Sequence, residues 1–327
     1  MKPLADDKAR RVATMLMVSV ICAMAFMQLP TVASGAQAKA ASPTRIKPKV
    51  GIDTRFGDLA TGAQIAMHRQ DFATGIAKAT AALEMRPDDK NAAVLYALRG
   101  HGYFSTNEYR RAIADCDEAL RRDPNVRGAY GNRGAAYVEL GEHRKGIEDL
   151  TIALQRDPKF PSDLYYRRAL AYSRVRAPER ARADWLQITK LPARDGLERA
   201  TRACAYHSLR NYKAAAADYA AAKRASGSVP WILNAAAWFE ATCPDAAFRN
   251  GKAAVRDAIR LCEITKWQKP GYIDTLAAAY AETGDFVQAV HYAQQALKTA
   301  TPRIRDDVEK HLRSFEKQKP WREEGEL

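Results

Sequence analysis

The stretch Tyr272–Val290, YIDTLAAAYAETGDFVQAV, carries the clearest structural pattern in the chain. Alanines recur through it, aromatic residues stand at fixed intervals, and one Gly284-Asp285 pair interrupts it. Two interpretations compete. In the first, Asp274 and Thr275 lie on an active-site helix and carry chemistry. In the second, two helices pack closely at their alanines and turn at Gly284-Asp285, and the rest of the sequence favours this one.

The same spacing recurs along the chain. Four tyrosines lie 34, 35 and 34 residues apart, each with a small residue three positions before it and another nine positions after it. The tyrosines are Tyr103, Tyr137, Tyr172 and Tyr206, preceded by Gly100, Gly134, Ala169 and Ala203 and followed by Ala112, Gly146, Ala181 and Ala215. Ala277, Tyr280 and Ala289 repeat the template in the opening stretch. Because a larger side chain at a helix crossing costs about 1–3 kcal/mol by overpacking, the small residues mark where two helices cross.

This pattern resembles the tetratricopeptide repeat (TPR), a helix-turn-helix unit of 34 residues. The resemblance implies an all-α fold, a right-handed superhelical solenoid of about seven TPR units with a C-terminal capping helix from Pro302 to about Phe315. The sixth unit carries the insertion TCPDAAFRNG, and the ending FEKQKPWRE resembles the tail of a terminal module in bacterial TPR proteins. The units are expected to begin near Gly57, Ala93, Arg127, Ser162, Gly196, Pro230 and Pro270.

The N-terminus has the organisation of a secretory signal. Four Lys and Arg residues and the apolar run 12–29 precede Ala36-Gln37-Ala38, where a signal peptidase finds small residues. We therefore expect a signal peptide at 1–38, a flexible basic linker at 39–56, the TPR solenoid at 57–318 and a C-terminal tail at 319–327. The protein is expected to be exported, in the periplasm. The alternative is an anchor formed by an uncleaved N-terminal helix, because the apolar run approaches the length of a membrane span.

The charge of the chain restricts its partners. Lys and Arg number 52 against 38 acidic residues, a net charge of +14, which favours anionic partners. In an exported protein these are acidic polypeptides or envelope polymers rather than nucleic acid, with the membrane or cell wall close by. The dense basic run RRALAYSRVRAPERARADW, which begins at Arg167, is either a solvated surface or an anion-binding patch.

The sequence offers little for catalysis. It contains no Gly-x-Ser-x-Gly, no His-Glu-x-x-His, no P-loop and no Gly-x-Gly-x-x-Gly, so we expect no enzyme, no cofactor and no metal site. Four cysteines follow the signal, an even number that permits disulfides in an oxidising compartment. We instead expect small buried thiols. Cys243 and Cys262 in particular are expected to stay unbridged, because about 16 Å of helix separates them.

The resemblance also implies a binding surface, since the first helix of each TPR unit lines a concave groove that accepts extended or helical peptides. The implied groove residues are His101, Phe104, Asn132, Tyr166, Arg167, Arg174 and His207. Gly128 and Gly131, in a stripe with Gly134 on one helix, are expected to keep the groove wall low.

Some TPR domains hold a C-terminal carboxylate with five polar side chains. Asn132 and Arg167 match two of those positions, whereas Ala97, His101 and Asp163 depart from them. Asn132, Tyr166 and Arg167 are nevertheless expected to hold an extended polypeptide with an acidic group, because arginine pairs carboxylates in a fork. The alternative is that Arg167 pairs internally with Glu139 and binds nothing.

The function that the sequence favours is a protein–protein interaction scaffold in the bacterial cell envelope, with a polypeptide of unknown identity in the groove. One alternative is an adaptor for a cell-wall polymer or carbohydrate, which would use exposed Tyr and Trp with the basic patch. Another is a helper subunit whose catalytic partner is a separate chain.

Overall fold

The computed structural model describes residues 52–85, 87–156 and 161–323, and this part of the chain holds fifteen α-helices, one short 3-10 helix and no strand. The predicted all-α repeat fold is therefore confirmed. The predicted signal peptide 1–38 and its cleavage site lie outside the described residues. The helices are α2 (Ile52–His68), α3 (Phe72–Glu84), α4 (Asp89–Ser105), α5 (Tyr109–Arg122), α6 (Ala129–Glu139), α7 (His143–Arg156), α8 (Pro161–Arg174), α9 (Pro178–Lys190), α10 (Gly196–Ser208), α11 (Tyr212–Ser226), α12 (Pro230–Thr242), η1 (Ala246–Phe248), α13 (Gly251–Ile264), α14 (Pro270–Glu282), α15 (Phe286–Thr299) and α16 (Pro302–Glu316).

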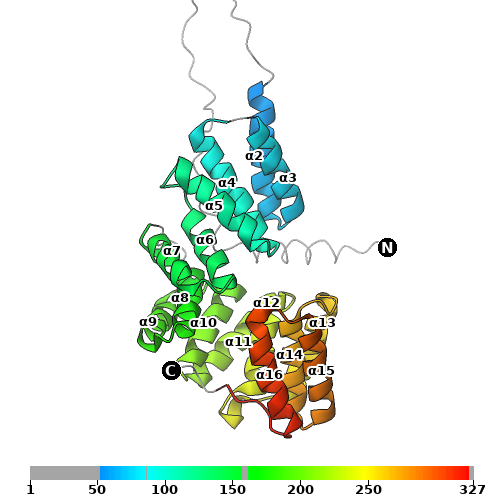
Figure 1. Ribbon diagram of the computed structural model, residues 1–327. Helices are drawn as coiled ribbons and strands as arrows, with labels where there is room; N and C mark the ends of the chain where they lie inside the picture. Colours follow the sequence, from blue (N-terminus) through cyan, green and yellow to red (C-terminus); the bar gives the residue numbers. More distant parts are fainter. Residues whose placement is uncertain (1–51, 86, 157–160, 324–327) are drawn as a thin grey trace, which may run out of the picture. The chain divides into compact units, whose positions relative to one another are not determined.

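The α-helices follow one another as seven pairs and a final single helix, α16, in the order that the repeat predicts. The chain divides after Glu139 into two compact units (Figure 1). We call α2–α6 the N-terminal unit and α7–α16 the C-terminal unit. Within the N-terminal unit α2 contacts α4 and α4 contacts α6, and within the C-terminal unit α8, α10, α12 and α14 contact one another in succession. These first helices of the pairs form the inner layer of each unit, and we call them the inner helices.

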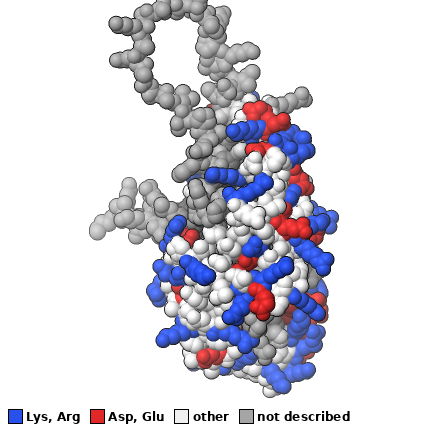
Figure 2. Space-filling view, turned by 90° about the vertical axis from the view of Figure 1, so that its left-hand side faces the viewer, with Lys and Arg blue, Asp and Glu red and all other residues white. Residues whose placement is uncertain are grey.

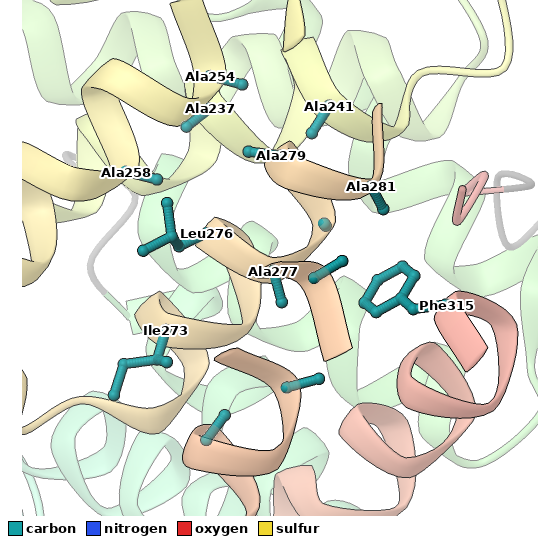
Figure 3. Close-up of a cluster of buried hydrophobic side chains, with 14 of the residues drawn as sticks. Ala237, Ala241, Ala254, Ala258, Ile273, Leu276, Ala277, Ala279, Ala281 and Phe315 are labelled. Atoms are coloured by element: carbon teal, nitrogen blue, oxygen red, sulfur yellow. The ribbon is translucent and has the colours of Figure 1, made fainter. Parts of the chain in front are cut away.

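The predicted close crossing is visible at Gly100 on α4. A methyl group added there would lie 3.0 Å from Cys116 Sγ and 3.2 Å from the carbonyl oxygen of Ala112, on the facing helix α5. In the last pair, Ala277 and Ala289 are both fully buried in one cluster. Figure 3 shows how alanines of α12, α13 and α14 fill this cluster, with Phe315 of α16 beside Ala281. The alanines of the opening stretch are therefore contact surfaces.

The two polar residues of that stretch serve the same packing. Asp274 is 6% exposed and its Oδ2 lies 2.8 Å from His311 Nδ1 on α16. Thr275 is 1% exposed and donates a hydrogen bond to Asn234 Oδ1 on α12 at 2.8 Å. Both side chains therefore hold neighbouring helices against α14, in agreement with the packing interpretation.

The structure corrects two details of the sequence analysis. Helix α2 begins at Ile52, so the last five residues of the predicted linker 39–56 are helical, because Phe56 packs with Leu59 against the first apolar cluster. Gly128 does not belong to a helical glycine stripe. It precedes α6 with φ +78°, a left-handed conformation that glycine adopts without strain, whereas Gly131 and Gly134 are buried within α6.

The described cysteines are all free thiols, as expected for the pair Cys243 and Cys262. Cys116, Cys243 and Cys262 are fully buried, and Cys204 is partly buried. Burial raises the pKa of Cys204 and of Cys262 to about 12, so neither thiol is a nucleophile at neutral pH.

Candidate functional site

A repeating ion pair ties each inner helix to its outer partner in three of the pairs. It joins Arg99 to Asp115, Arg168 to Asp184 and Arg202 to Asp218, each through two hydrogen bonds of 2.7–2.9 Å. The partners are always 16 residues apart in sequence. Arg168 belongs to the dense basic run, so this guanidinium holds the fold together instead of offering charge to a ligand. The spacing was present in the sequence as a second period of 34 to 35 residues, and the sequence analysis missed it.

Three predicted groove residues lie on inner helices of the N-terminal unit. His101 and Phe104 are partly buried on α4, where the His101 ring lies 6.0 Å from the ring of Phe72. Asn132 on α6 is only 3% exposed, and its Oδ1 has no hydrogen-bond partner among the described residues. Asn132 is thus set below the surface of its unit, with an acceptor that the described structure leaves unused.

Tyr166 and His207 lie on inner helices of the C-terminal unit and pack against aromatic rings. The Tyr166 ring lies edge-on to Trp185 at 5.6 Å and to Trp231 at 5.9 Å. His207 is 8% exposed, with its ring 5.1 Å from Phe239. Burial raises the pKa of Tyr166 well above 10.0 and lowers the pKa of His207 to about 4. At neutral pH both side chains are therefore uncharged packing residues.

The two predicted groove arginines have acidic partners inside the C-terminal unit. Arg167 Nε lies 2.8 Å from Asp163 Oδ2 on the same helix, so the internal partner in the structure is Asp163, where the sequence suggested Glu139. Arg174 Nη2 lies 3.2 Å from Asp307 Oδ2 and joins the end of α8 to α16. Asn132 belongs to one unit and Tyr166 and Arg167 to the other, so the combined three-residue site stays a prediction.

A segment that the sequence analysis treated as a tail is part of the C-terminal unit. We call residues 317–323, which follow α16, the C-terminal strap. The Trp321 ring packs 4.6 Å from the ring of His311, against the cluster of Figure 3. The strap then reaches inner helix α12, where Trp238 donates through Nε1 to Glu323 Oε2.

The strap and the insertion of the sixth unit complete the C-terminus of α12. The last carbonyls of a helix have no donor within the helix, and Pro244 prevents α12 from continuing. The strap supplies the Glu323 N–H to the Thr242 oxygen at 3.0 Å and Arg322 Nη1 to the Ala241 oxygen at 3.3 Å. The insertion supplies Arg249 Nη1 to the Cys243 oxygen at 2.8 Å. Two segments far apart in sequence thus cap one helix.

One carboxylate connects these two caps. Glu282, the last residue of α14, pairs through Oε1 with Arg249 Nε at 2.9 Å and through Oε2 with Arg322 Nη2 at 2.5 Å. Its side chain is 14% exposed, so water screens the pairs only in part. The end of α12, the insertion, the strap and Glu282 form the most heavily connected polar site of the C-terminal unit.

The surface charge is dispersed rather than concentrated. On the face drawn in Figure 2, Lys and Arg side chains are spread over the surface with Asp and Glu between them. Within the described residues no group of three or more His, Cys, Asp or Glu is placed to hold a metal ion. No helix among those residues is long and apolar enough to cross a membrane.

Comparison with known proteins agrees with this architecture. A model of the tetratricopeptide repeat family matches residues 93–126 and 128–160. None of the curated proteins matches the chain.

Three solved structures illustrate the similarity. The APC/C hetero-tetramer Cut9-Hcn1 is 14% identical, with a TM-score of 0.59 over 82% of this chain and 50% of that chain. A monomeric mutant of IFIT1 with Gppp-AAAA is also 14% identical, with a TM-score of 0.56 over 81% of this chain and 65% of that chain. A tetratricopeptide repeat protein from Parabacteroides merdae is 14% identical, with a TM-score of 0.49 over 80% of this chain and 99% of that chain.

The first two of these relatives are longer than the present chain, which spans half of the Cut9-Hcn1 chain. At this level of identity the likeness shows the fold and nothing further. Tetratricopeptide repeat folds generally mediate protein–protein interactions, and scaffolds of this family are generally not enzymes. The matched repeats and the paired-helix architecture show that this chain belongs to the tetratricopeptide repeat proteins.

Proposed function

We propose that this protein is a scaffold of the bacterial cell envelope that binds an extended polypeptide along its inner helices. One observation carries the proposal: inner helix α12 already holds an extended segment, the C-terminal strap. The strap is held by a main-chain hydrogen bond from Glu323 to the Thr242 oxygen and by a side-chain hydrogen bond from Trp238 to Glu323. A surface that accepts this segment has the width and the polar groups that an extended ligand needs.

The occupant of this surface also indicates the chemistry of the ligand. Glu323 is acidic, and its carboxylate contributes, after burial, to the raised pKa values of Tyr166 on α8 and Cys204 on α10. The field of an acidic side chain bound at α12 therefore extends to two other inner helices. The net charge of +14 of the whole chain favours the approach of acidic polypeptides.

A pull-down from intact cells tests the proposal. Cells are treated with a short amine-reactive crosslinker, the tagged protein is isolated under denaturing conditions, and crosslinked peptides are identified by mass spectrometry. We expect a defined polypeptide crosslinked to lysines of the inner helices. Crosslinks confined to outer helices would contradict binding along the inner helices.

One observation favours the alternative of an adaptor for a cell-wall polymer. Trp267 is 37% exposed and stacks on Tyr292 at 5.8 Å, and Tyr292 stacks on Tyr280 at 5.5 Å. Exposed aromatic faces of this kind stack on sugar rings. Retention on purified cell-wall polymer in moderate salt, and its loss in Trp267→Ala, would support this alternative over the polypeptide scaffold.

The location in the periplasm is part of the same proposal and rests on the N-terminal sequence. Cleavage after Ala38 gives a mature protein that begins with Lys39. N-terminal sequencing of the native protein tests this directly, since an intact Met1 in the membrane fraction would show an uncleaved anchor instead. A helper subunit of a separate enzyme remains the third possibility, and co-purification of an enzyme in the same pull-down would indicate it.

A further inference from the structure

We infer that the C-terminal strap is an intramolecular ligand, which covers the peptide-binding surface at α12 until an acidic segment of a partner polypeptide displaces it. The inference rests on the proposed function, because it assigns the covered surface to the partner. It also adds a regulatory role to a segment that the sequence analysis described only as a tail.

The contacts of the strap are suited to exchange. Beyond the ring of Trp321, the contacts described for its last two residues are polar: Arg322 pairs with Glu282 and caps Ala241, and Glu323 bonds to Trp238 and Thr242. A polar contact exchanged for an equivalent one in a complex changes the free energy little, so a matching ligand can replace the strap without leaving buried groups unpaired.

Helix α16, which carries the strap, is held to α8 by one surface contact. That contact is Arg174 with Asp307, at 3.2 Å, with side chains 51% and 33% exposed. Exposed ion pairs of this kind contribute about 0–1 kcal/mol. Release of the strap therefore requires no large loss at α8, whereas the packing of α16 on α14 and α15 keeps the helix itself in place.

The strap defines the ligand that competes with it. Trp321, Arg322 and Glu323 present an aromatic ring, a guanidinium and a carboxylate in succession, to the alanine-rich cluster, Glu282 and Trp238 respectively. The partner segment is therefore expected to be extended and to carry an aromatic, a basic and an acidic residue in this order. Its acidic side chain takes the place of Glu323 at Trp238 Nε1.

A peptide with the sequence of residues 317–323, acetylated and amidated so that Glu323 is its only carboxylate, serves as the probe. Its binding to three full-length proteins is measured by fluorescence anisotropy: the wild type, R322A/E323A and the matched control K317A/K319A. Lys317 and Lys319 are exposed residues of the same strap, so the control changes the same number of charged side chains without touching the contacts at α12. Circular dichroism and thermal melting check that each protein is folded.

We expect the peptide to bind R322A/E323A at least tenfold more tightly than the wild type and the control. A peptide with Gln in place of Glu323 should lose most of that gain. Should R322A/E323A lose helicity, the single variant Glu323→Gln replaces it, because it keeps the side-chain volume and removes only the charge.

Two outcomes would overturn the inference in different ways. Equal, measurable binding to all three proteins would show that the surface accepts extended peptides but that the strap does not cover it, so the proposed function would stand. Binding to none of the three would show that α12 accepts no such peptide in trans, and the assignment of the partner to this surface would fall as well.

Discussion

Glu282 and Arg322 form an ion pair of 2.5 Å although 40 residues separate them in sequence. The same carboxylate also pairs with Arg249, which lies 33 residues before it. Both arginines donate to carbonyls at the end of α12, so one acidic side chain holds the two segments that cap this helix. The C-terminus of the chain is thus part of the sixth and seventh repeats rather than an appendage to them.

The Glu282–Arg322 pair is expected to contribute measurably to stability. A double-mutant cycle with Glu282→Ala and Arg322→Ala should give a coupling free energy of about 1–3 kcal/mol, because both side chains are largely removed from water and share a network. Urea unfolding followed by circular dichroism measures it. The matched cycle on the exposed pair Arg174 and Asp307 should give less than about 1 kcal/mol. Equal coupling in the two cycles would contradict the role given to Glu282.

Two adjacent arginines on α8 are expected to differ sharply in their effect on folding. Arg168→Ala leaves Asp184, whose side chain is 5% exposed, without its bidentate partner, and should lower the free energy of unfolding by about 3 kcal/mol. Arg167→Ala removes only a pair within one helix turn and should cost less than about 1 kcal/mol. Urea midpoints of the two variants compare them directly. Similar losses would show that the repeating Arg–Asp pair has no special structural weight.

The same Arg167→Ala variant tests the predicted peptide site. If Arg167 contacts an acidic ligand, partner capture should weaken about tenfold or more, in line with a charge-assisted hydrogen bond of about 1.5–3 kcal/mol. The melting temperature should hardly change. Titration of the partner found in the pull-down measures the affinity. Unchanged capture would mean that Arg167 serves only its pair with Asp163 and that binding takes place elsewhere.

The packing of the last repeat gives a further prediction. Ala289 is fully buried in the cluster that includes Ala277, so Ala289→Leu should cost about 1–3 kcal/mol by overpacking. Val287→Leu is the control on the same helix, because Val287 is 79% exposed and should tolerate the change. Urea melts of both variants measure the effect, and an unshifted midpoint for Ala289→Leu would contradict the close crossing.

His207 should make the stability of the protein depend on pH. Burial lowers its pKa from 6.5 to about 4 in the folded state, so the unfolded chain binds the proton more readily. The stability that neutral His207 preserves is complete above about pH 6.5 and is lost as the pH falls towards 4. From the shift in pKa, the loss at pH 4.5 is about 2–3 kcal/mol.

The comparison that isolates this group uses His207→Gln, which does not titrate. The difference in free energy of unfolding between wild type and variant is measured at pH 7.5 and at pH 4.5. It should move by about 2–3 kcal/mol in favour of the variant at the lower pH. A difference independent of pH would show that His207 reaches solvent and is protonated in the folded protein.

The sequence by itself determined the repeat. Small residues at fixed distances from a tyrosine, as at Gly100 and Ala112, specify a crossing between two helices that follow each other directly, and this information is local. The number of helix pairs, the insertion after Thr242 and the final helix from Pro302 were therefore predictable, and the structure agrees with each. The 16-residue spacing of Arg168 and Asp184 was equally local and was available in the sequence.

Only the tertiary structure decided what the groove residues contact and where the chain ends. Arg174 meets Asp307 133 residues later, and Arg322 meets Glu282, because four stacked repeats bring α16 and the strap back to the inner helices. The accumulated rotation of successive repeats sets these distances, and no periodic pattern encodes it. Burial likewise turned His207 from an expected ligand contact into a neutral packing residue, since the desolvation that lowers its pKa comes from rings such as Phe239 on the next inner helix.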